Sequence, residues 1–275
     1  MTNQQDSSGG AAAAPRAMSP SRAADFKSCP LKFRYRTIDR LPEPPSASAA
    51  RGTLVHAALQ GMFAKPADER TEASATAALP ELWADMLAGR PELADLPEIA
   101  DLEAWFGAAH DLLHTYFGME DPRGFEPEAC ELRVEATLGN DVPARGFIDR
   151  VDVSPTGLIR IVDYKTGRAP AAAYSDNALF QLKFYALMLF RLRGVVAARL
   201  RLIYLGNAKF LEYTPDEAGL IAFERTVVAL WGVIQEATAT GHFPPKRSKL
   251  CDWCAFKPFC PEFGGTPPAY PLPVR

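Results

Sequence analysis

The segment of residues 159–165, Ile-Arg-Ile-Val-Asp-Tyr-Lys, is the feature of the sequence that most constrains the fold. An apolar run ends here in an acid and a base two positions apart, and a Thr-Gly turn signal follows at once. Side chains at positions i and i+2 of a strand lie on the same face. We therefore expect Asp163 and Lys165 to project into one small volume at the end of a buried strand. The pair is either a surface ion pair, which contributes little to stability, or a metal-binding carboxylate beside a catalytic cation.

The rest of the chain alternates between strand and helix patterns. Strands are predicted where apolar and polar residues alternate over short stretches, and helices where apolar residues recur every three or four positions. The predicted strands cover residues 131–138, 142–153, 158–164 and 199–206. The predicted helices cover residues 50–63, 101–117, 177–194 and 216–241, and a further short helix begins at Ser19 or Ser21. This order of elements predicts an α/β fold.

Two turns determine how the first three strands pair. Antiparallel pairing about the turn Ser-Pro-Thr-Gly places Asp149 opposite Asp163. Pairing about the turn Gly-Asn-Asp places Glu131 opposite Asp149, with Glu135 on the same strand face as the alternative. Facing side chains of an antiparallel pair have Cβ atoms ~5 Å apart. The sheet is thus expected to hold three carboxylates in one row beside Lys165.

Such a row predicts a metal site. Carboxylates that are close together and partly buried repel each other strongly unless a cation neutralises them. Oxygen ligands favour a hard ion, Mg²⁺ or Mn²⁺, which can orient a water molecule, lower its pKa and polarise a phosphoryl oxygen. Lys165 could position or deprotonate that water, or stabilise charge that develops on a phosphate. A solvated sheet face with scattered acids is the less favoured reading, because these acids lie in otherwise apolar strands.

The bulk composition is that of an ordinary globular protein. The chain has 275 residues, 48% apolar and 23% charged, enough for one large domain or two small ones. Residues 1–18 are rich in Gly, Ala, Ser and Gln, a composition that predicts a disordered tail. They lack the basic start and the apolar core of a signal peptide. No apolar run is long enough to span a bilayer, so a cytoplasmic protein without a membrane partner is expected.

Charge is unevenly distributed along the chain. The net charge is −3, but residues 66–128 hold 15 acidic and 3 basic residues and are predicted to form an acidic helical insertion. The remaining residues, 27 basic against 18 acidic, carry a net charge of +9 and contain all the motifs described here. For a polyanionic partner the local sign of charge matters more than the total. The chain has no phosphate-binding loop of the G-x-x-x-x-G-K-[ST] type, so no motor driven by such a loop is expected.

Three of the five cysteines are closely spaced near the C-terminus. Cys251, Cys254 and Cys260 form a Cys-x₂-Cys-x₅-Cys pattern, and a cytosolic protein would not use them as disulfides. Three thiolates this close together require a metal and a fourth ligand, for which Cys29 is the candidate. A structural zinc site normally takes its ligands from two nearby pairs, unlike this arrangement, although zinc remains an alternative. Cys130 has no partner pattern and is expected in the core.

These motifs together resemble those of a known family. The stretches Gly-Phe-Ile-Asp-Arg-Val-Asp-Val and Leu-Ile-Arg-Ile-Val-Asp-Tyr-Lys-Thr-Gly are similar to the core of the PD-(D/E)XK nucleases, specifically the RecB-like branch. The resemblance assigns the family's acids to Asp149 and Asp163 and its lysine to Lys165. It places further metal ligands at Glu131 and at the backbone near Tyr164.

Two helices carry further motifs of that branch. Arg-Gly-Thr-Leu-Val-His resembles its Gly-x-x-x-His pattern, which implies that His56 is an additional metal ligand. Phe-Gln-Leu-Lys-Phe-Tyr-Ala-Leu resembles its Gln-x-x-x-Tyr helix, which implies that Gln181 and Tyr185 orient the substrate. At a spacing of i, i+4 these two polar side chains share one face of an otherwise apolar helix.

The cysteine spacing resembles the iron–sulfur staple of AddB-type nuclease domains and of CRISPR-associated RecB-like exonucleases. The resemblance implies a [4Fe–4S] cluster bound by Cys29, Cys251, Cys254 and Cys260. Such a cluster would bring two basic segments together beside aromatic residues, a surface suited to a single strand or a frayed end. A solvated charged face is the alternative for any one of these residues. The candidate nucleic-acid contacts are Arg22, Lys27, Lys32, Arg34, Lys246 and Arg247.

The resemblance extends from about residue 19 to 262. It implies a restriction-endonuclease-like α/β/α core with a mixed sheet. One nuclease domain is expected over residues 19–265, and it includes the cysteine tail at 244–263. A Pro-rich tail at 266–275 is expected to follow it. The expected function is a metal-dependent DNA exonuclease with a [4Fe–4S] cluster, acting in repair or recombination. A non-catalytic DNA-end-binding module, for instance a helicase partner, is the alternative, and an RNA nuclease is a third possibility.

Overall fold

The protein is described here by a computed structural model that covers residues 15–171 and 175–270. Contacts between residues divide the chain into two compact units. The first, called here the sheet unit, comprises residues 45–138 and 144–224. The second, called the terminal unit, comprises the described parts of residues 1–44, 139–143 and 225–275. Met18, which the sequence assigns to a disordered tail, is fully buried in the terminal unit, where its backbone N–H donates to the carbonyl of Pro143 at 2.7 Å.

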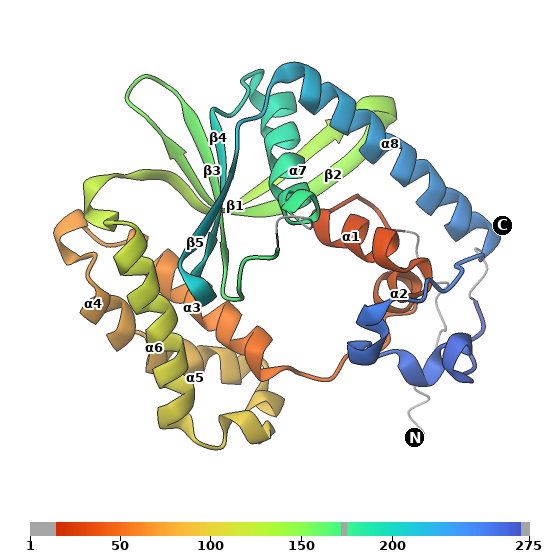
Figure 1. The fold of residues 1–275 in the computed structure, drawn as a ribbon, viewed down its shortest axis with the longest axis horizontal. Coiled ribbons are helices and arrows are strands. Elements are labelled where there is room, and N and C mark those ends of the chain that lie inside the picture. Colours follow the sequence, from red (N-terminus) through yellow and green to blue (C-terminus); the bar gives the residue numbers. More distant parts are fainter. Residues whose placement is uncertain (1–14, 172–174, 271–275) are drawn as a thin grey trace, which may run out of the picture. The chain divides into compact units, whose positions relative to one another are not determined.

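The sheet unit is built on one five-stranded mixed sheet (Figure 1). The strands follow the order β1-β2-β3-β4-β5, with an antiparallel β2/β3 pair, a parallel β3/β4 pair and an antiparallel β4/β5 pair. The predicted α/β fold with a mixed sheet is therefore confirmed. The strands are β1 (Pro127–Leu138), β2 (Val142–Val153), β3 (Ile159–Lys165), β4 (Arg199–Tyr204) and β5 (Lys209–Tyr213).

The pairing of β2 with β3 has the register that the turn predicts. Arg150 lies opposite Val162, and Val153 lies opposite Ile159. Because side chains alternate between faces, Asp149 and Asp163 lie on one face of this pair, and Arg150 and Tyr164 lie on the other. A one-residue slip would have exchanged the two sets.

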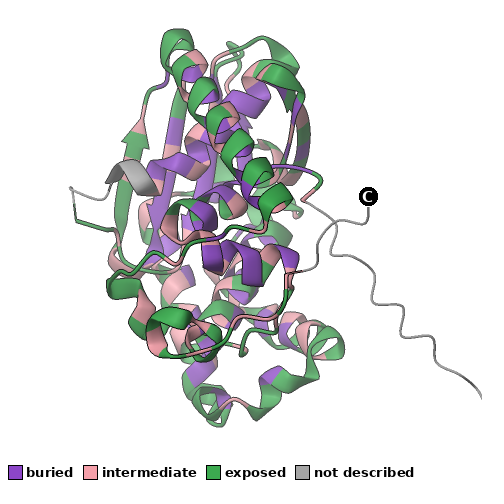
Figure 2. Ribbon diagram, turned by 90° about the vertical axis from the view of Figure 1, so that its right-hand side faces the viewer, coloured by how far each residue is buried: buried purple, intermediate pink, exposed green. Residues whose placement is uncertain are grey.

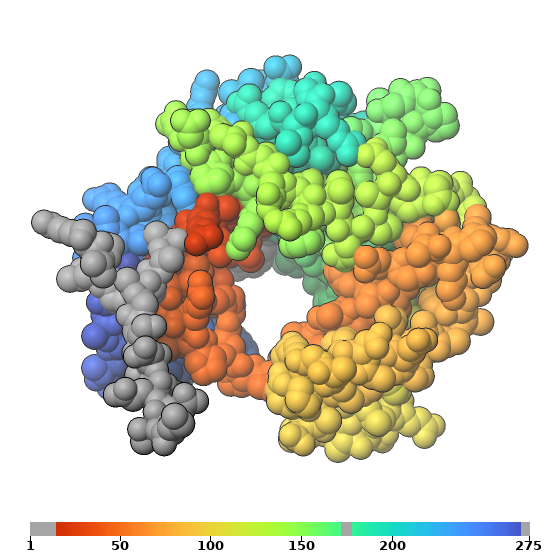
Figure 3. Space-filling view, turned by 180° about the vertical axis from the view of Figure 1, so that it is seen from behind, coloured from red at the N-terminus to blue at the C-terminus, as the bar shows by residue number. Residues whose placement is uncertain are grey.

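The face of the sheet that bears Val162 and Tyr164 is covered by helices. Their apolar side chains form one buried core with these two residues and Ile203, and the rings of Trp83 and Trp105 pack 4.5 Å apart within it. Figure 3 shows these helices from behind as one continuous orange-to-yellow mass. They are α3 (Ala47–Phe63), α4 (Glu72–Ala77), α5 (Leu79–Gly89) and α6 (Leu102–Met119). Leu102, the first residue of α6, is 45% exposed although it is apolar.

The opposite face of the sheet is covered by α7 (Ser175–Arg193), the crossover between the parallel strands β3 and β4. Leu182, Ala186 and Leu189 on this helix are buried, as are Leu200 and Leu202 of β4. Figure 2 shows buried positions running along the strands and along the inner faces of the helices. The sheet is therefore enclosed on both sides, as the predicted α/β/α layering requires.

The terminal unit joins the start of the chain to its end. Ser19 caps α1 (Pro20–Ser28) by accepting from the backbone N–H of Arg22, as predicted. The Tyr35 hydroxyl donates to the carbonyl of Phe259 at 2.7 Å, and the Lys246 ammonium donates to the carbonyl of Lys27 at 3.0 Å. The remaining elements here are α2 (Pro30–Phe33), a π-helical turn η1 (Arg34–Ile38), the part of α8 (Glu217–Thr240) from residue 225 onward, and the short turns η6 (Gly139–Asp141), η9 (Lys249–Trp253), η10 (Lys257–Phe259) and η11 (Pro261–Phe263).

Short 3₁₀ turns complete the sheet unit. They are η2 (Ala67–Glu69), η3 (Pro91–Asp95), η4 (Pro97–Ile99), η5 (Pro122–Gly124) and η8 (Leu205–Asn207). The acidic stretch of residues 66–128 thus contains α4, α5 and α6, in agreement with its helical prediction. Among the helices of the described residues, none has both the length and the apolar character that a bilayer crossing demands.

Candidate metal centre and acid–lysine site

Three potential metal ligands converge in the sheet unit. One ligand atom each of His56 on α3, Glu131 on β1 and Asp149 on β2 lie within 4.8 Å of one another. They come from three separate elements, so the pairing of β1 with β2 and the packing of α3 on the sheet assemble the group. Carboxylate oxygens are the ligands that Mg²⁺ and Mn²⁺ prefer, and the imidazole nitrogen adds a ligand that transition-metal ions accept more readily than Mg²⁺ does.

An unusual backbone conformation occurs at Glu131. Its φ is +49°, a left-handed value that non-glycine residues rarely adopt inside a strand. Such conformations are found where the surrounding structure fixes a side chain for a particular task. The alternative acid, Glu135, is exposed and forms an ion pair with Arg133. The structure therefore brings Glu131, and not Glu135, to His56 and Asp149.

His56 has one ring nitrogen engaged and one directed at the acids. Its Nε2 lies 3.1 Å from the carbonyl oxygen of Tyr164, which can only accept, so Nε2 carries the proton in this contact. Burial lowers the pKa of His56, an effect that the charge of Asp163 opposes. Burial thus favours the neutral ring, and Nδ1 lies 3.4 Å from Asp149 Oδ2 and 4.0 Å from Glu131 Oε1.

Asp149 is held by backbone as well as by its neighbours. Its Oδ2 accepts a hydrogen bond from the N–H of Tyr164 at 2.8 Å. Burial, followed by the charge of Asp163, raises the pKa of Asp149 to about 8. The same two causes raise the pKa of Glu131. A nitrogen lone pair and two carboxylates that face one another need either a proton or a metal cation between them.

Asp163 lies beside this group and is engaged by Lys165. Its side chain is 1% exposed, and its Oδ2 lies 2.6 Å from Lys165 Nζ. Among the described residues, no donor makes a well-aligned hydrogen bond to either of its oxygens. Asp163 falls outside the set of three convergent ligand atoms, although its charge acts on all three residues. A buried carboxylate that is paired through one oxygen only is a suitable additional ligand for a cation.

Lys165 begins a chain of polar contacts that leads onto α7. Its Nζ donates to Gln181 Oε1 at 2.9 Å, and Gln181 Nε2 donates to the Tyr185 hydroxyl at 2.9 Å. The predicted i, i+4 pair on α7 therefore lies next to the acid–lysine pair at the end of β3. Among the residues that the structure describes, these contacts engage the ammonium group through Asp163 and Gln181, which leaves one of its three N–H donors for substrate or water.

Gly146 on β2 was not singled out from the sequence. A Cβ atom at this position would lie 2.6 Å from Cε1 of Tyr185. Only a glycine at position 146 therefore leaves room for the ring of Tyr185 to pack against β2. A glycine inside a strand pattern is a signal of such a close approach.

The cysteines lie in the terminal unit, apart from Cys130 on β1. Cys29, Cys251, Cys254 and Cys260 line one cavity of about 240 Å³. Among the described residues, no three of their sulfurs lie within 4.8 Å of one another. Four thiolates on one zinc at Zn–S distances of about 2.3 Å would be closer together than that. The backbone N–H groups of Lys246 and Ser248 donate to the sulfurs of Cys29 and Cys251 at 3.4 Å each.

The predicted nucleic-acid contacts differ in exposure. Lys27, Lys246 and Arg247 are exposed. Arg22 and Lys32 are half-buried, with Arg22 donating to the carbonyl of Ala17 at 2.7 Å and Lys32 paired with Asp25 at 3.1 Å.

Arg34 does not belong to this surface. It is 6% exposed, forms an ion pair with Asp39 at 2.9 Å and donates to the carbonyl of Pro268. Its expected role at the surface is therefore corrected to packing within the terminal unit. A cationic residue in a basic stretch gives no sequence signal that it points inward.

Comparisons with known proteins show the family to which this chain belongs. The Gene 69 protein of Mycobacterium phage D29 is 25% identical to this chain over 274 residues, which cover 89% of this chain and 96% of the phage protein. The fold is similar to that of a crystal structure from Eubacterium rectale named as a candidate exonuclease, with a TM-score of 0.56, 14% identity and 92% of each chain covered. The sequence pattern of the PD-(D/E)XK nuclease superfamily matches residues 17–261. That match spans most of the chain, including both sets of candidate ligands, and the chain belongs to the PD-(D/E)XK nuclease superfamily.

Proposed function

We propose that this nuclease is a metal-dependent DNA exonuclease that binds Mg²⁺ or Mn²⁺ at His56, Glu131 and Asp149. Asp163 completes the ligand set in this proposal, whereas the carbonyl of Tyr164, predicted as a further ligand, is engaged by Nε2 of His56 on the side of the ring away from Nδ1. The observation that carries it is the convergence of His56 Nδ1 with the carboxylate oxygens of Asp149, at 3.4 Å, and of Glu131, at 4.0 Å. The buried Oδ1 of Asp163, which has no hydrogen-bond partner among the described residues, gives independent support.

The chemistry divides between the ion and the protein's own groups. The bound ion would supply Lewis acidity and a water of lowered pKa. Lys165, held between Asp163 and Gln181, directs a remaining N–H donor toward the attacking water or a phosphate oxygen. Tyr185 supports Gln181 through their hydrogen bond and is suited to orient the substrate backbone. Phosphodiester hydrolysis needs these components: a fixed cation, an oriented water and compensation of charge on the phosphate.

A [4Fe–4S] cluster in the terminal unit is the second part of the proposal. Cys29, Cys251, Cys254 and Cys260 line one cavity, whereas Cys130 lies on β1 in the sheet unit. Four thiolates are the usual ligands of such a cluster.

Single-stranded DNA ends in repair or recombination are the proposed substrate. Trp253 is 80% exposed in the cysteine tail, near the exposed basic residues Lys246 and Arg247. Exposed aromatic rings beside basic side chains suit the stacking of bases and the binding of phosphates. A helicase that exposes such ends is the proposed partner of this activity.

The activity is tested on end-labelled single-stranded DNA with Mn²⁺, with Mg²⁺ and with EDTA. We expect divalent-ion-dependent release of nucleotides from linear DNA, and circular single strands should stay intact. Asp163→Asn and Lys165→Ala should each lower the cleavage rate by about 10²-fold or more, with DNA affinity changed only slightly. Lys209→Ala, which removes an exposed lysine on β5, is the matched control and should cleave normally.

Two outcomes would contradict the proposal. Cleavage that persists in EDTA or in both site variants would show that the site is not its source. Binding of DNA ends with no cleavage in any divalent ion would instead identify a non-catalytic module. An RNA strand of the same sequence, digested faster than DNA, would correct the substrate class.

A further inference from the structure

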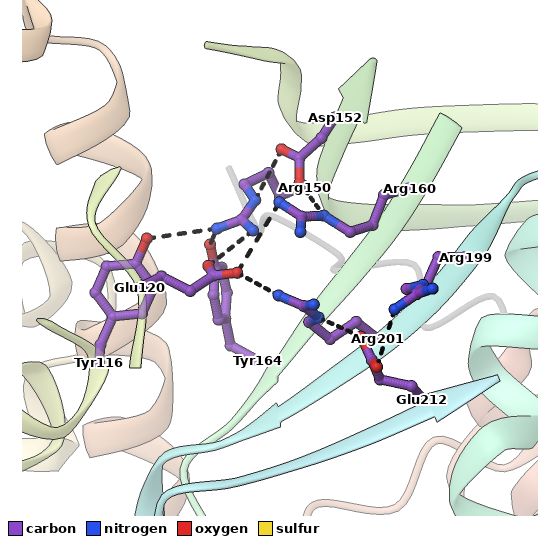
Figure 4. A network of polar contacts seen from close by, with 9 residues as sticks. All are labelled: Tyr116, Glu120, Arg150, Asp152, Arg160, Tyr164, Arg199, Arg201 and Glu212. Carbon is purple, nitrogen blue, oxygen red and sulfur yellow. Dashed lines mark hydrogen bonds and ion pairs between the residues drawn. The ribbon is translucent and has the colours of Figure 1, made fainter. Parts of the chain in front are cut away.

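Arg150 is a fully buried cation next to the metal group. Its side chain is 0% exposed, although it directly follows Asp149 in β2. The alternation of the strand sends its guanidinium to the opposite face of the sheet from the Asp149 carboxylate. Figure 4 shows this guanidinium at the centre of a network of polar side chains. Neither the expected site nor the proposed mechanism uses it.

The guanidinium is surrounded by two acids, a hydroxyl group and two aromatic rings. Its Nη2 lies 2.9 Å from Glu120 Oε2 and its Nε 3.0 Å from Asp152 Oδ1, while Nη1 donates to the Tyr164 hydroxyl at 2.6 Å. The rings of Phe125 and Phe63 lie over it, with centroids 4.8 and 5.2 Å from Cζ. Two carboxylates and two aromatic faces thus hold one buried cation in a single orientation.

The network extends across the sheet beyond Arg150. Glu120, at the end of α6, also pairs with Arg201 of β4 at 2.8 Å, and Arg201 pairs in turn with Glu212 of β5 at 2.7 Å. Asp152 pairs with Arg160 of β3 at 2.8 Å. Figure 4 shows these dashed contacts running from α6 over the strands. The positions of the strands relative to α6 are therefore coupled through charge as well as through packing.

Tyr164 connects this network to the metal group. Its hydroxyl accepts from Arg150 on one face of the sheet. Its backbone N–H donates to the Asp149 carboxylate, and its carbonyl accepts from Nε2 of His56. The orientation of two of the three convergent ligands thus depends on where the Tyr164 peptide groups lie. Groups that hold metal ligands in place commonly change metal affinity by about 10–100-fold when they are removed.

We infer that Arg150 is a positioning residue for the metal centre and acts through Tyr164. By fixing the tyrosine hydroxyl, it fixes the peptide N–H and carbonyl that orient Asp149 and His56. The inference rests on the proposed metal-binding function of these residues. It adds to that function a cation on the far side of the sheet that makes no contact with substrate or metal.

A purely structural role makes a different prediction. In that case loss of Arg150 would lower stability as the loss of any buried arginine does, and the folded fraction would bind metal normally. Arg70 provides the comparison, because it is 3% exposed, pairs with Glu126 and lies over the same Phe63 ring at 5.6 Å. Its other bonds go to the carbonyls of Lys65, Pro122 and Phe125, none of which contacts the metal group.

The test is Mn²⁺ binding by calorimetry to the full-length wild type and three variants, with folding checked by circular dichroism. We expect Arg150→Lys and Tyr164→Phe to weaken Mn²⁺ binding by about 10–100-fold. Arg70→Lys should lower Tm but leave the Mn²⁺ affinity within about twofold of the wild type. Tyr164→Phe removes only a hydroxyl, so it keeps the test valid if Arg150→Lys does not fold.

Wild-type Mn²⁺ affinity in a folded Tyr164→Phe or Arg150→Lys protein would overturn the inference. An equal loss of affinity in Arg70→Lys would also overturn it, because the effect would then be one of general stability. Catalysis is not needed for this readout. A wild type that binds Mn²⁺ without cleaving any nucleic acid would therefore contradict the proposed function alone.

Discussion

At the scale of single residues, the titration of Asp149 makes the stability of the protein depend on pH. Burial and the charge of Asp163 raise its pKa to about 8 in the folded protein, whereas an Asp in an unfolded chain titrates near 4. Between these values the folded, metal-free protein holds a proton that the unfolded chain has released. The contribution of Asp149 to the free energy of unfolding therefore decreases as pH rises through that window. Below and above the window this contribution does not change with pH.

We accordingly expect the Tm of the metal-free protein to fall between about pH 5 and pH 8. Each kcal/mol lost corresponds to about 2–4 °C for a chain of this size. Asp149→Asn cannot titrate and should flatten the fall, whereas Asp141→Asn in the exposed turn between β1 and β2 should not. Scanning calorimetry in EDTA measures both. The account is contradicted if Asp149→Asn keeps the pH dependence of the wild type.

Metal binding should show the opposite pH trend, since the ion competes with the proton on Asp149. The rise in Tm that Mn²⁺ produces should therefore grow between about pH 6 and pH 8. This trend follows from the same raised pKa and comes from the same calorimeter.

At the scale of secondary-structure elements, the contact of α7 with β2 depends on Gly146. Gly146→Ala would place a Cβ 2.6 Å from the Tyr185 ring and displace it, together with its bond to Gln181. Displacements of about 1 Å in a positioned site can cost about 10²-fold in rate. We expect a loss of that order in kcat with the protein still folded.

Gly61→Ala is the control for that substitution. Gly61 lies in α3, and a Cβ atom added there would meet nothing within 4 Å. Alanine at this position should stabilise the helix by about 1 kcal/mol, and the activity should match the wild type. Full activity in Gly146→Ala would mean that catalysis does not depend on the observed position of the Tyr185 ring.

Local patterns predict most elements of this fold. The register of β2 with β3 follows from a short turn and from alternation, and both are sequence signals. Strand β5 was not predicted, because Lys-Phe-Leu-Glu-Tyr is a short edge strand whose Phe210 is exposed. It is defined by its pairing with β4, which is a tertiary contact.

The site could be predicted in its residue types but not in all its geometry. Asp163 and Lys165 share a face because they are two positions apart, and Gln181 and Tyr185 because they are four apart. The choice of Glu131 over Glu135 depends on a left-handed backbone conformation that its residue type disfavours. Glu120, one of the two acids that pair with Arg150, lies at the end of a helix distant in sequence. No local sequence pattern therefore indicates this ion pair.

At the scale of the whole molecule, the cysteines bear on how the two ends of the chain are held. Cys29 precedes the sheet unit in sequence, whereas Cys251, Cys254 and Cys260 follow it, so a shared cluster would close a loop of roughly 200 residues. Binding energy of such a group adds directly to folding energy.

Cys29→Ser should therefore lower both the iron content and the Tm of protein purified without oxygen. Cys130→Ser removes a thiol from β1 and should change neither iron content nor colour. Metal analysis with visible absorption makes the measurement. Stoichiometric zinc in place of iron, or iron content unaffected by Cys29→Ser, would contradict the cluster.

The central claim is that separate strands and a helix bring His56, Glu131 and Asp149 together tightly enough to capture a divalent ion. Anomalous diffraction from a crystal soaked in Mn²⁺ tests it most directly. The account predicts one manganese peak bounded by His56 Nδ1 and the carboxylate oxygens of Glu131 and Asp149, with Lys165 nearby. Saturating Mn²⁺ with no peak there, or with those carboxylates turned away from one another, would contradict it.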